Sequence, residues 1–191
     1  MPILPTTARV RRHAMAFAVA TAVSAATLPT TATACDSMPS WVQFGCNRAD
    51  QIWTEGNSDL YLSGWAWHNR NHYAPSTISR FREFAVGGGY GRSLYDSDGD
   101  WHGVYAMAFL DSHSNVQPVA GYGYQYVGHF AGDFRLGAGY TLFVTARKDM
   151  MHYIPFPAAL PLVSMGYKQA NIYATYIPGG NVLYMFARWS F

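Results

Sequence analysis

The sequence predicts an all-β protein: an eight-stranded antiparallel transmembrane β-barrel with a short N-terminal interfacial segment. Residues 183–191 alternate in type, so that one face of a strand can meet lipid and the other a more mixed interior. A signal-like N-terminus precedes this run, and no apolar stretch between the two is long enough for a membrane helix. Aromatic residues reach 16% and charged residues only 13%, a balance typical of a barrel with aromatic side chains at the membrane interfaces.

Residues 1–34 are typical of a secretory signal peptide. Residues 9–13 form a basic start, residues 14–28 are apolar and mostly small, and residues 32–34 offer a small-x-small cleavage site. The apolar run is shorter than the roughly 20 residues that a membrane anchor needs, so we expect cleavage and export to the outer membrane. The chain has 13 basic and 11 acidic residues, and without the three arginines of the signal the balance is 10 to 11. We therefore expect no nucleic-acid partner.

Residues 35–56 form a leader ahead of the expected barrel. Its cysteines, Cys35 and Cys46, are the only two in the chain. An oxidising periplasm favours a disulfide between them, and the alternative is a lipidated Cys35. Ala32, where a lipidation signal usually has Leu, favours the disulfide. The apolar residues scattered through 37–56 indicate either an amphipathic segment at the membrane interface or a plug packed on the barrel.

The barrel is expected to occupy residues 57–191, which suits eight strands of the length that crosses a bilayer. Alternation and turn residues set the strand boundaries. The predicted strands are 59–69, 80–94, 100–112, 116–127, 133–147, 158–167, 170–177 and 181–191. Segment 147–161 contains three prolines, which interrupt strand pairing. We expect an extracellular loop there, or else a local gap in the barrel wall.

Alternation in the fourth and fifth predicted strands indicates a cavity inside the barrel. In the fifth, the apolar alternate residues from Phe134 to Val144 are assigned to the lipid face. In the fourth, three alternating tyrosines take that face. The residues that then point inward are Val119, Gly121 and Gly123. The missing glycine side chains leave space for something slender and apolar, and a hydrocarbon chain is the natural candidate in a membrane.

Three polar residues are candidates for chemistry. His68 ends the first predicted strand, and Asp111 and Ser112 end the third, so all three reach the same rim if the strands run up and down. A histidine base, a carboxylate and a hydroxyl are a set used in acyl transfer, although Asp-Ser is also an ordinary turn pair. His68 and His72 are four residues apart without an HExxH motif. We therefore expect no metal site and no cofactor.

The chain resembles the outer-membrane lipid A palmitoyltransferases of the PagP family in five stretches. These are DLYLSGWAWH (59–68), GDWHGVYAMAFLDS (99–112), PVAGYGY (118–124), TARKDMMHYIPFPAALPLVSMGY (145–167) and TYIPGGNV (175–182). The resemblance implies a monomeric outer-membrane barrel with an internal hydrocarbon pocket. It also implies transfer of palmitate from the sn-1 position of a phospholipid to a hydroxyacyl chain of lipid A.

The resemblance also assigns residues. It places His68, Asp111 and Ser112 at the extracellular rim, with His68 as general base and Asp111 as its orienting or charge-stabilising partner. Ser112 is then the nucleophile or a hydroxyl that supports the oxyanion. Gly123 corresponds to the pocket floor, and its retention favours a 16-carbon chain; Gly121 and Val119, assigned to the same inward face by alternation, are the other expected substrate-binding residues.

Some positions depart from the family pattern, and other functions fit the same residues. Ser63 stands where the first strand usually has proline, and residues 84–86 and 166–170 also differ, which bears on the route by which lipids enter. The alternative functions are a phospholipase or lipid A deacylase, in which water replaces the acceptor, and a non-catalytic structural or adhesive barrel.

Overall fold

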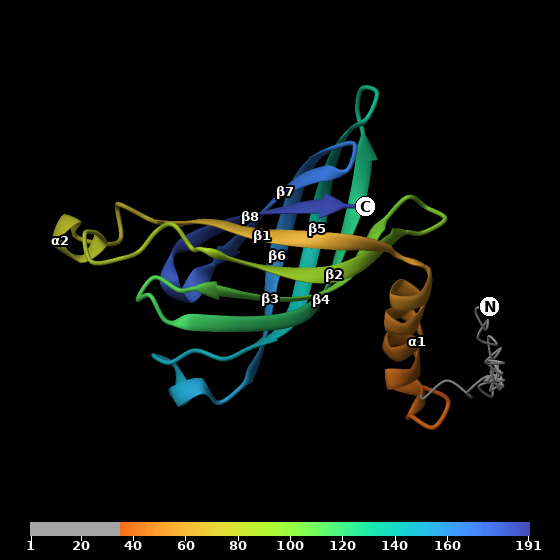
Figure 1. The fold of residues 1–191 in the computed structure, drawn as a ribbon, viewed down its shortest axis with the longest axis horizontal. Helices are drawn as coiled ribbons and strands as arrows, with labels where there is room; N and C mark the ends of the chain where they lie inside the picture. The colour runs from red at the N-terminus through yellow and green to blue at the C-terminus, as the bar shows by residue number, and fades with distance from the viewer. Residues whose placement is uncertain (1–34) are drawn as a thin grey trace, which may run out of the picture. The chain divides into compact units, whose positions relative to one another are not determined.

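The computed structural model describes residues 35–191, so the predicted signal peptide lies outside the described residues. Eight antiparallel strands close into a barrel, each paired with its neighbours in sequence and β1 paired with β8 (Figure 1). The strands are β1 (Asn57–His68), β2 (Gly87–Tyr95), β3 (Trp101–Leu110), β4 (Val116–His129), β5 (Phe134–Thr145), β6 (Phe156–Tyr167), β7 (Ala170–Ile177) and β8 (Val182–Ser190). The predicted fold class is confirmed.

The second predicted strand, 80–94, is wrong in its first part. Strand β2 begins only at Gly87, and the preceding residues form the short helix α2 (Pro75–Ile78) and a loop that meets β1 through one bridge, Trp65 to Phe84. Phe81 of this loop stacks on the ring of His68, with 4.4 Å between ring centroids. The segment folds over the end of the barrel because its aromatic side chains pack there.

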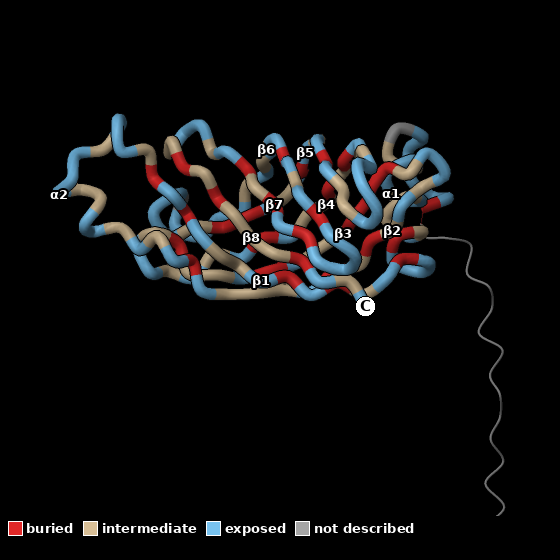
Figure 2. Tube along the Cα trace, turned by 90° about the horizontal axis from the view of Figure 1, so that it is seen from above, coloured by how far each residue is buried: buried red, intermediate tan, exposed pale blue. Residues whose placement is uncertain are grey.

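Along the strands, exposed and buried residues alternate, as the colours of Figure 2 show. In β5 the residues assigned to the lipid face are exposed, from Leu136 to Val144, while Gly137 and Thr141 between them are buried. In β8, Arg188 is buried and Trp189 is exposed. An outward apolar band with an inward mixed face is the pattern of a membrane barrel. Among the described residues, no helix has the length and apolar character needed to cross a membrane.

A β-bulge in β1 decides which way His68 points. Asp59 and Tyr61 are buried, and after the bulge the buried residues are Ala66 and His68. The ladder to β8 skips Gly64, which has no partner in the register. Because side chains alternate with a period of two, one extra residue moves the inward set from odd to even positions. His68 therefore faces the interior and not the lipid.

One half of the barrel interior, near α1 and the β2–β3 turn, is filled with side chains. We call it the closed half. Trp101, Leu162 and Tyr173 form a buried cluster there, and Arg188 makes a buried ion pair with Asp59 at 3.2 Å. Filling by side chains is expected for the interior of a small barrel.

Strand pairing is incomplete near the opposite end. The β6–β7 ladder covers only residues 163–167 and 170–174, and the earlier part of β6, with Pro157 and Pro161, pairs with β5 alone. The predicted interruption of strand pairing by the prolines is confirmed on the side of β6 that faces β7. A loop that extends to residue 161 is wrong, because β6 begins at Phe156. The β1–β2 ladder likewise stops at Leu62.

The leader is helical. Helix α1 (Ser40–Glu55) precedes β1, and a disulfide joins Cys35 to Cys46, which confirms the favoured interpretation of this cysteine pair. Phe44 and Trp53 are exposed on α1 while Ile52 is fully buried, an amphipathic arrangement. Its location at a membrane interface stays a prediction.

Candidate active site

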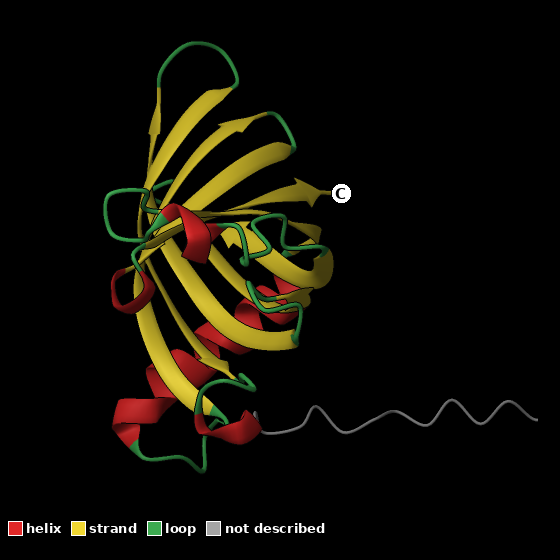
Figure 3. Cartoon of the chain, turned by 90° about the vertical axis from the view of Figure 1, so that its left-hand side faces the viewer, coloured by secondary structure: helices red, strands yellow, loops and turns green. Residues whose placement is uncertain are grey.

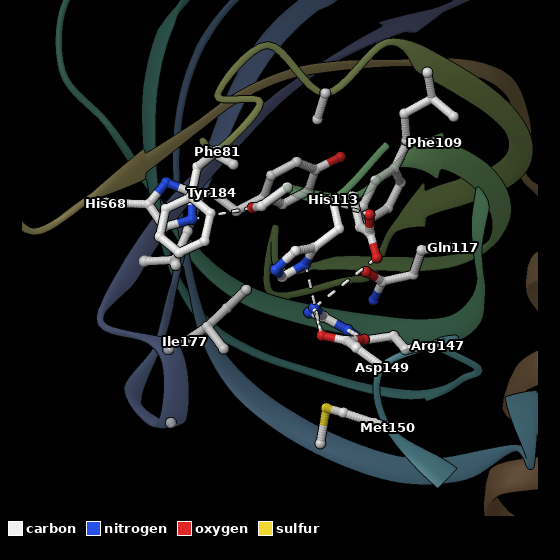
Figure 4. Close-up of a pocket in the computed structure, with 18 of the residues that line it drawn as sticks. His68, Phe81, Phe109, His113, Gln117, Arg147, Asp149, Met150, Ile177 and Tyr184 are labelled. Atoms are coloured by element: carbon white, nitrogen blue, oxygen red, sulfur yellow. Dashed lines mark hydrogen bonds and ion pairs between the residues drawn. The ribbon is translucent and has the colours of Figure 1, made fainter. Parts of the chain in front are cut away.

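The topology brings four loops to one end of the barrel. Because neighbouring strands are antiparallel, the connections after β1, β3, β5 and β7 all lie at the end that carries α2; Figure 3 views the molecule from this end. These loops and the adjacent strand ends line a cavity of about 360 Å³ (Figure 4). His68, Asp111 and Ser112, predicted to share one rim, all line it.

Ser112 and His68 are hydrogen-bonded. The Ser112 Oγ atom lies 3.0 Å from His68 Nε2, and the His68 side chain is almost completely buried. Phe81 stacks on the imidazole, and Tyr73 meets it edge-on with 5.9 Å between ring centroids. The aromatic rings hold the imidazole in place and exclude water from its face. A hydroxyl within hydrogen-bond reach of an oriented imidazole is the geometry of an activated nucleophile.

The group at the other ring nitrogen of His68 is Glu83, which the sequence analysis missed. Its Oε1 lies 3.4 Å from His68 Nδ1 and accepts the backbone N–H of His68 at 3.2 Å. Arg70 donates two hydrogen bonds to this carboxylate, of 2.6 and 2.7 Å, and they lower the pKa of Glu83 to about 2. Glu83 was assigned to a strand, but one signal was available: the chain has only one other glutamate, Glu55.

Asp111 makes no hydrogen bond to His68 among the described residues, and its implied role as orienting or charge-stabilising partner stays a prediction. Its Oδ1 accepts the backbone N–H groups of His113 and Asn115, both at 2.8 Å. Its buried Oδ2 has no hydrogen-bond partner among the described residues and faces Arg147, at 4.0 Å from Nη2. Asp111 therefore shapes the turn that carries Ser112, as Asp does in Asx turns, and holds a negative charge at the cavity wall.

A second charged group lies across the cavity from His68. Arg147 donates to both carboxylate oxygens of Asp149, at 2.9 and 2.7 Å, and this lowers the pKa of Asp149. Asp111, His113 and Asp149 place donor atoms within 4.8 Å of one another. Arg147 pairs with Asp149 and lies 4.0 Å from Asp111, and Figure 4 shows it beside His113 and Asp149, so a guanidinium supplies positive charge to this cluster. In the other histidine pair, His68 and His72, both ring nitrogens of His68 already have partners.

Below the rim, the interior becomes apolar. A smaller cavity of about 60 Å³ is lined mainly by aromatic and aliphatic side chains, among them Val119, Phe143 and Phe186. Of the predicted substrate-binding residues, Val119 faces this space. The other two have no room for a side chain. A Cβ atom on Gly121 would be 2.5 Å from Phe143 Cβ on β5, and one on Gly123 would be 2.8 Å from the Trp101 ring atom Cζ3.

Comparison with known proteins gives one consistent result. The sequence model of the family described as "Antimicrobial peptide resistance and lipid A acylation protein PagP" matches residues 48–188. The chain is 59% identical over 168 residues to "Lipid A acyltransferase PagP" of Bordetella pertussis strain Tohama I, which covers 86% of this chain and 92% of that protein. It is 47% identical over 165 residues to a Legionella pneumophila protein of the same name, with 84% and 88% covered.

Proposed function

The chain belongs to the PagP family of lipid A acylation proteins, and we propose that it transfers palmitate from the sn-1 position of a phospholipid to a hydroxyacyl chain of lipid A. It is an acyltransferase, as its relatives are named. The observation that carries the proposal is the hydrogen bond from Ser112 to His68, 3.0 Å long, at the mouth of an apolar cavity inside the barrel. The apolar lining below the rim suits a lipid acyl chain, whose ester carbonyl would lie at the polar rim.

His68 acts as the general base. It takes the proton of the attacking hydroxyl as the new acyl–oxygen bond forms, and returns it to the glycerol oxygen when the sn-1 ester bond breaks and lysophospholipid leaves. The attacking hydroxyl belongs to Ser112 if an acyl-enzyme forms. It belongs to lipid A if transfer is direct, with Ser112 then supporting the oxyanion. Direct transfer needs one such cycle of His68. The acyl-enzyme route needs a second cycle, in which His68 takes the proton of the lipid A hydroxyl as it attacks the acyl-serine and returns that proton to Ser112 Oγ as the acyl–serine bond breaks.

Asp111 serves this reaction by holding the turn. Its carboxylate binds two backbone N–H groups of the segment that follows Ser112, which fixes the position of the serine relative to His68. Its second oxygen faces Arg147. Asp111 is therefore a positioning residue, and its charge also influences the field in the cavity.

The protein would work as a monomer in the outer membrane with this rim on the extracellular side. Two observations support the orientation and the lipid substrates. His68, Asp111 and Ser112 all line the cavity at the α2 end of the barrel, and the β6–β7 ladder does not extend to the part of β6 beside the cavity. A lipid in the outer leaflet could pass an acyl chain sideways through that opening. The apolar outward faces of the strands agree with a membrane location.

The test uses protein refolded in detergent, a phospholipid labelled in its sn-1 palmitate, and purified lipid A. Mass spectrometry follows the label, and Ser112→Ala and His68→Ala are assayed in parallel. We expect labelled lipid A with the wild type and a loss of at least about 100-fold with each variant, the scale of general-base catalysis. Free palmitate without acylated lipid A would identify a hydrolase. No turnover by a folded barrel would contradict any enzymatic role.

A further inference from the structure

A chain of polar contacts runs behind His68, on the side away from Ser112. Glu83 Oε1 contacts both Nδ1 and the backbone N–H of His68. Arg70 donates two hydrogen bonds to the same carboxylate and a third, of 3.1 Å, to the backbone carbonyl of His68. Two residues of the β1–β2 connection therefore hold one histidine through its ring and both of its backbone polar groups.

We propose that Glu83, held by Arg70, is the positioning residue that sets the tautomer and orientation of His68 for acyl transfer. The inference rests on the proposed function, and it assigns to Glu83 the orienting role that the family resemblance gave to Asp111. Glu83 touches neither substrate nor the reacting atoms, so it acts through His68.

The argument begins with the proton inventory of imidazole. A neutral imidazole has one N–H and one acceptor nitrogen, and His68 can accept a hydroxyl proton at Nε2 only if its own proton is on Nδ1. A carboxylate at Nδ1 accepts a hydrogen bond from Nδ1–H and so fixes this tautomer. Glu83 is the carboxylate within hydrogen-bond distance of Nδ1 among the described residues.

Arg70 keeps this carboxylate ionised and in place. The Glu83 side chain is only 15% exposed, and Arg70 is 45% exposed, so the guanidinium covers the carboxylate from the solvent side. The low pKa of Glu83, about 2, means that it carries its charge at every pH at which the protein would be assayed. A charged carboxylate also stabilises the imidazolium that forms when His68 takes a proton.

Other groups surround His68, but the charged ones among them lie across the cavity and not at Nδ1. Tyr73 and Phe81 present rings to the imidazole, and Ser112 is at Nε2. The charged and titratable groups across the cavity are Asp111, His113, Arg147 and Asp149. Arg147 forms an ion pair with Asp149 and so offsets one of the negative charges in this group. Glu83 and Arg70 therefore dominate the field at Nδ1.

The test is Glu83→Gln, which keeps the size and a carbonyl oxygen for the backbone N–H but removes the charge. We expect kcat to fall about 100-fold with the KM for both lipids unchanged, because the cavity is untouched. The acidic limb of the pH–rate profile should move to lower pH, since an imidazolium without its carboxylate loses its proton more readily. Glu55→Gln, at the only other glutamate, is the matched control and should match the wild type.

Arg70→Met is the second variant, because it leaves the Glu83 carboxylate in place without its clamp. We expect a smaller loss of kcat than for Glu83→Gln, with partial recovery in Arg70→Lys. If Glu83→Gln fails to fold as a barrel, an Arg70→Met protein with wild-type kcat and pH profile overturns the inference by itself.

The outcomes separate this inference from the proposed function. Full activity and an unchanged pH profile in a folded Glu83→Gln protein, beside inactive Ser112→Ala, would refute the role of Glu83 and leave the acyltransferase standing. Absence of transfer by the wild type would refute the proposed function first. A fall in kcat without any movement of the pH profile would reduce Glu83 to a structural residue.

Discussion

The two halves of the barrel interior are built in opposite ways. In the closed half, Trp101, Tyr173 and Leu162 pack together, and a buried ion pair joins Arg188 to Asp59. The half beneath the α2 loops, which we call the open half, contains the cavities, and its charged pairs are partly exposed. Both halves use the same strands, so the difference lies in the side chains that point inward.

This comparison indicates a division of labour along the barrel axis. Filling one end with side chains concentrates packing and buried polar contacts there, and leaves the other end free to hold a ligand and to place a histidine and a serine around it. We therefore expect substitutions in the closed half to change stability more than turnover, and substitutions at the rim to do the reverse.

Arg188→Met is expected to have the largest effect and would test the closed half. Asp59 is fully buried, and without its partner it becomes an uncompensated charge, which costs about 3–5 kcal/mol of unfolding free energy. Urea unfolding in detergent, followed by tryptophan fluorescence, measures the loss. The double variant Arg188→Met with Asp59→Asn should regain much of it.

The control for this prediction is Arg80→Met, at an exposed arginine, which should unfold at the wild-type midpoint. Folded Arg188→Met protein should keep a near-normal kcat. If its kcat falls as far as that of Glu83→Gln, the two halves are coupled and the division of labour is wrong.

Gly64→Val is expected to have the next largest effect, and it acts through the bulge. A Cβ atom at Gly64 would lie 2.7 Å from the backbone oxygen of Met185 on β8, so the ladder must shift. Since the bulge turns His68 inward, we expect activity to fall at least about tenfold, with a loss of about 1–3 kcal/mol in stability from overpacking. Gly128→Val is the control, because the nearest atom to a Cβ there is 3.7 Å away; equal effects of the two variants would exclude the bulge as the cause.

Gly123→Met addresses the boundary between the halves. The glycine lies beneath Trp101, so a side chain there would push the indole toward the cavity and shorten it. Each methylene of the acyl chain that loses its place costs about 0.8 kcal/mol, and the preferred donor should become shorter than 16 carbons. A series of phosphatidylcholines of different chain length measures the preference, and Gly128→Met serves as the control. An unchanged preference would mean that Gly123 does not limit the chain.

The open half shows what the sequence could predict and what it could not. Alternation predicted eight strands and a Val119 side chain that faces the barrel interior, because one face of each strand must meet lipid. Strand ends of a barrel meet at a common rim, which brought His68 and Ser112 together correctly. These are consequences of local periodicity and antiparallel topology, and both can be read without a structure.

The orientation of His68 and the contacts of Glu83 and Asp111 depend on interactions that sequence periodicity does not encode. The bulge at Gly64 changes the parity of β1, and only the register with β8 reveals it. Glu83 lies in a loop whose path is set by Phe81 stacking on His68 and by the Arg70 clamp. Asp111 stands beside Ser112 in sequence, yet its hydrogen bonds go to its own turn, and the carboxylate that contacts His68 belongs to Glu83, 28 positions earlier.

Arg70→Met is expected to have the smallest effect on stability, because it removes the Arg70–Glu83 pair of the open half. The pH dependence of that effect sharpens the comparison with the closed half. Glu83 has a folded-state pKa of about 2, below its ordinary value, so the pair stabilises the fold above that ordinary value and the contribution disappears as pH falls toward 2. Unfolding midpoints measured from pH 2 to pH 8 should show a small gap between wild type and Arg70→Met that closes in acid. Because Arg70 is partly exposed, solvent screens the pair, and the gap should be far smaller than for Arg188→Met. A gap that stays constant to pH 2 would mean that Arg70 stabilises the rim by packing and not by charge.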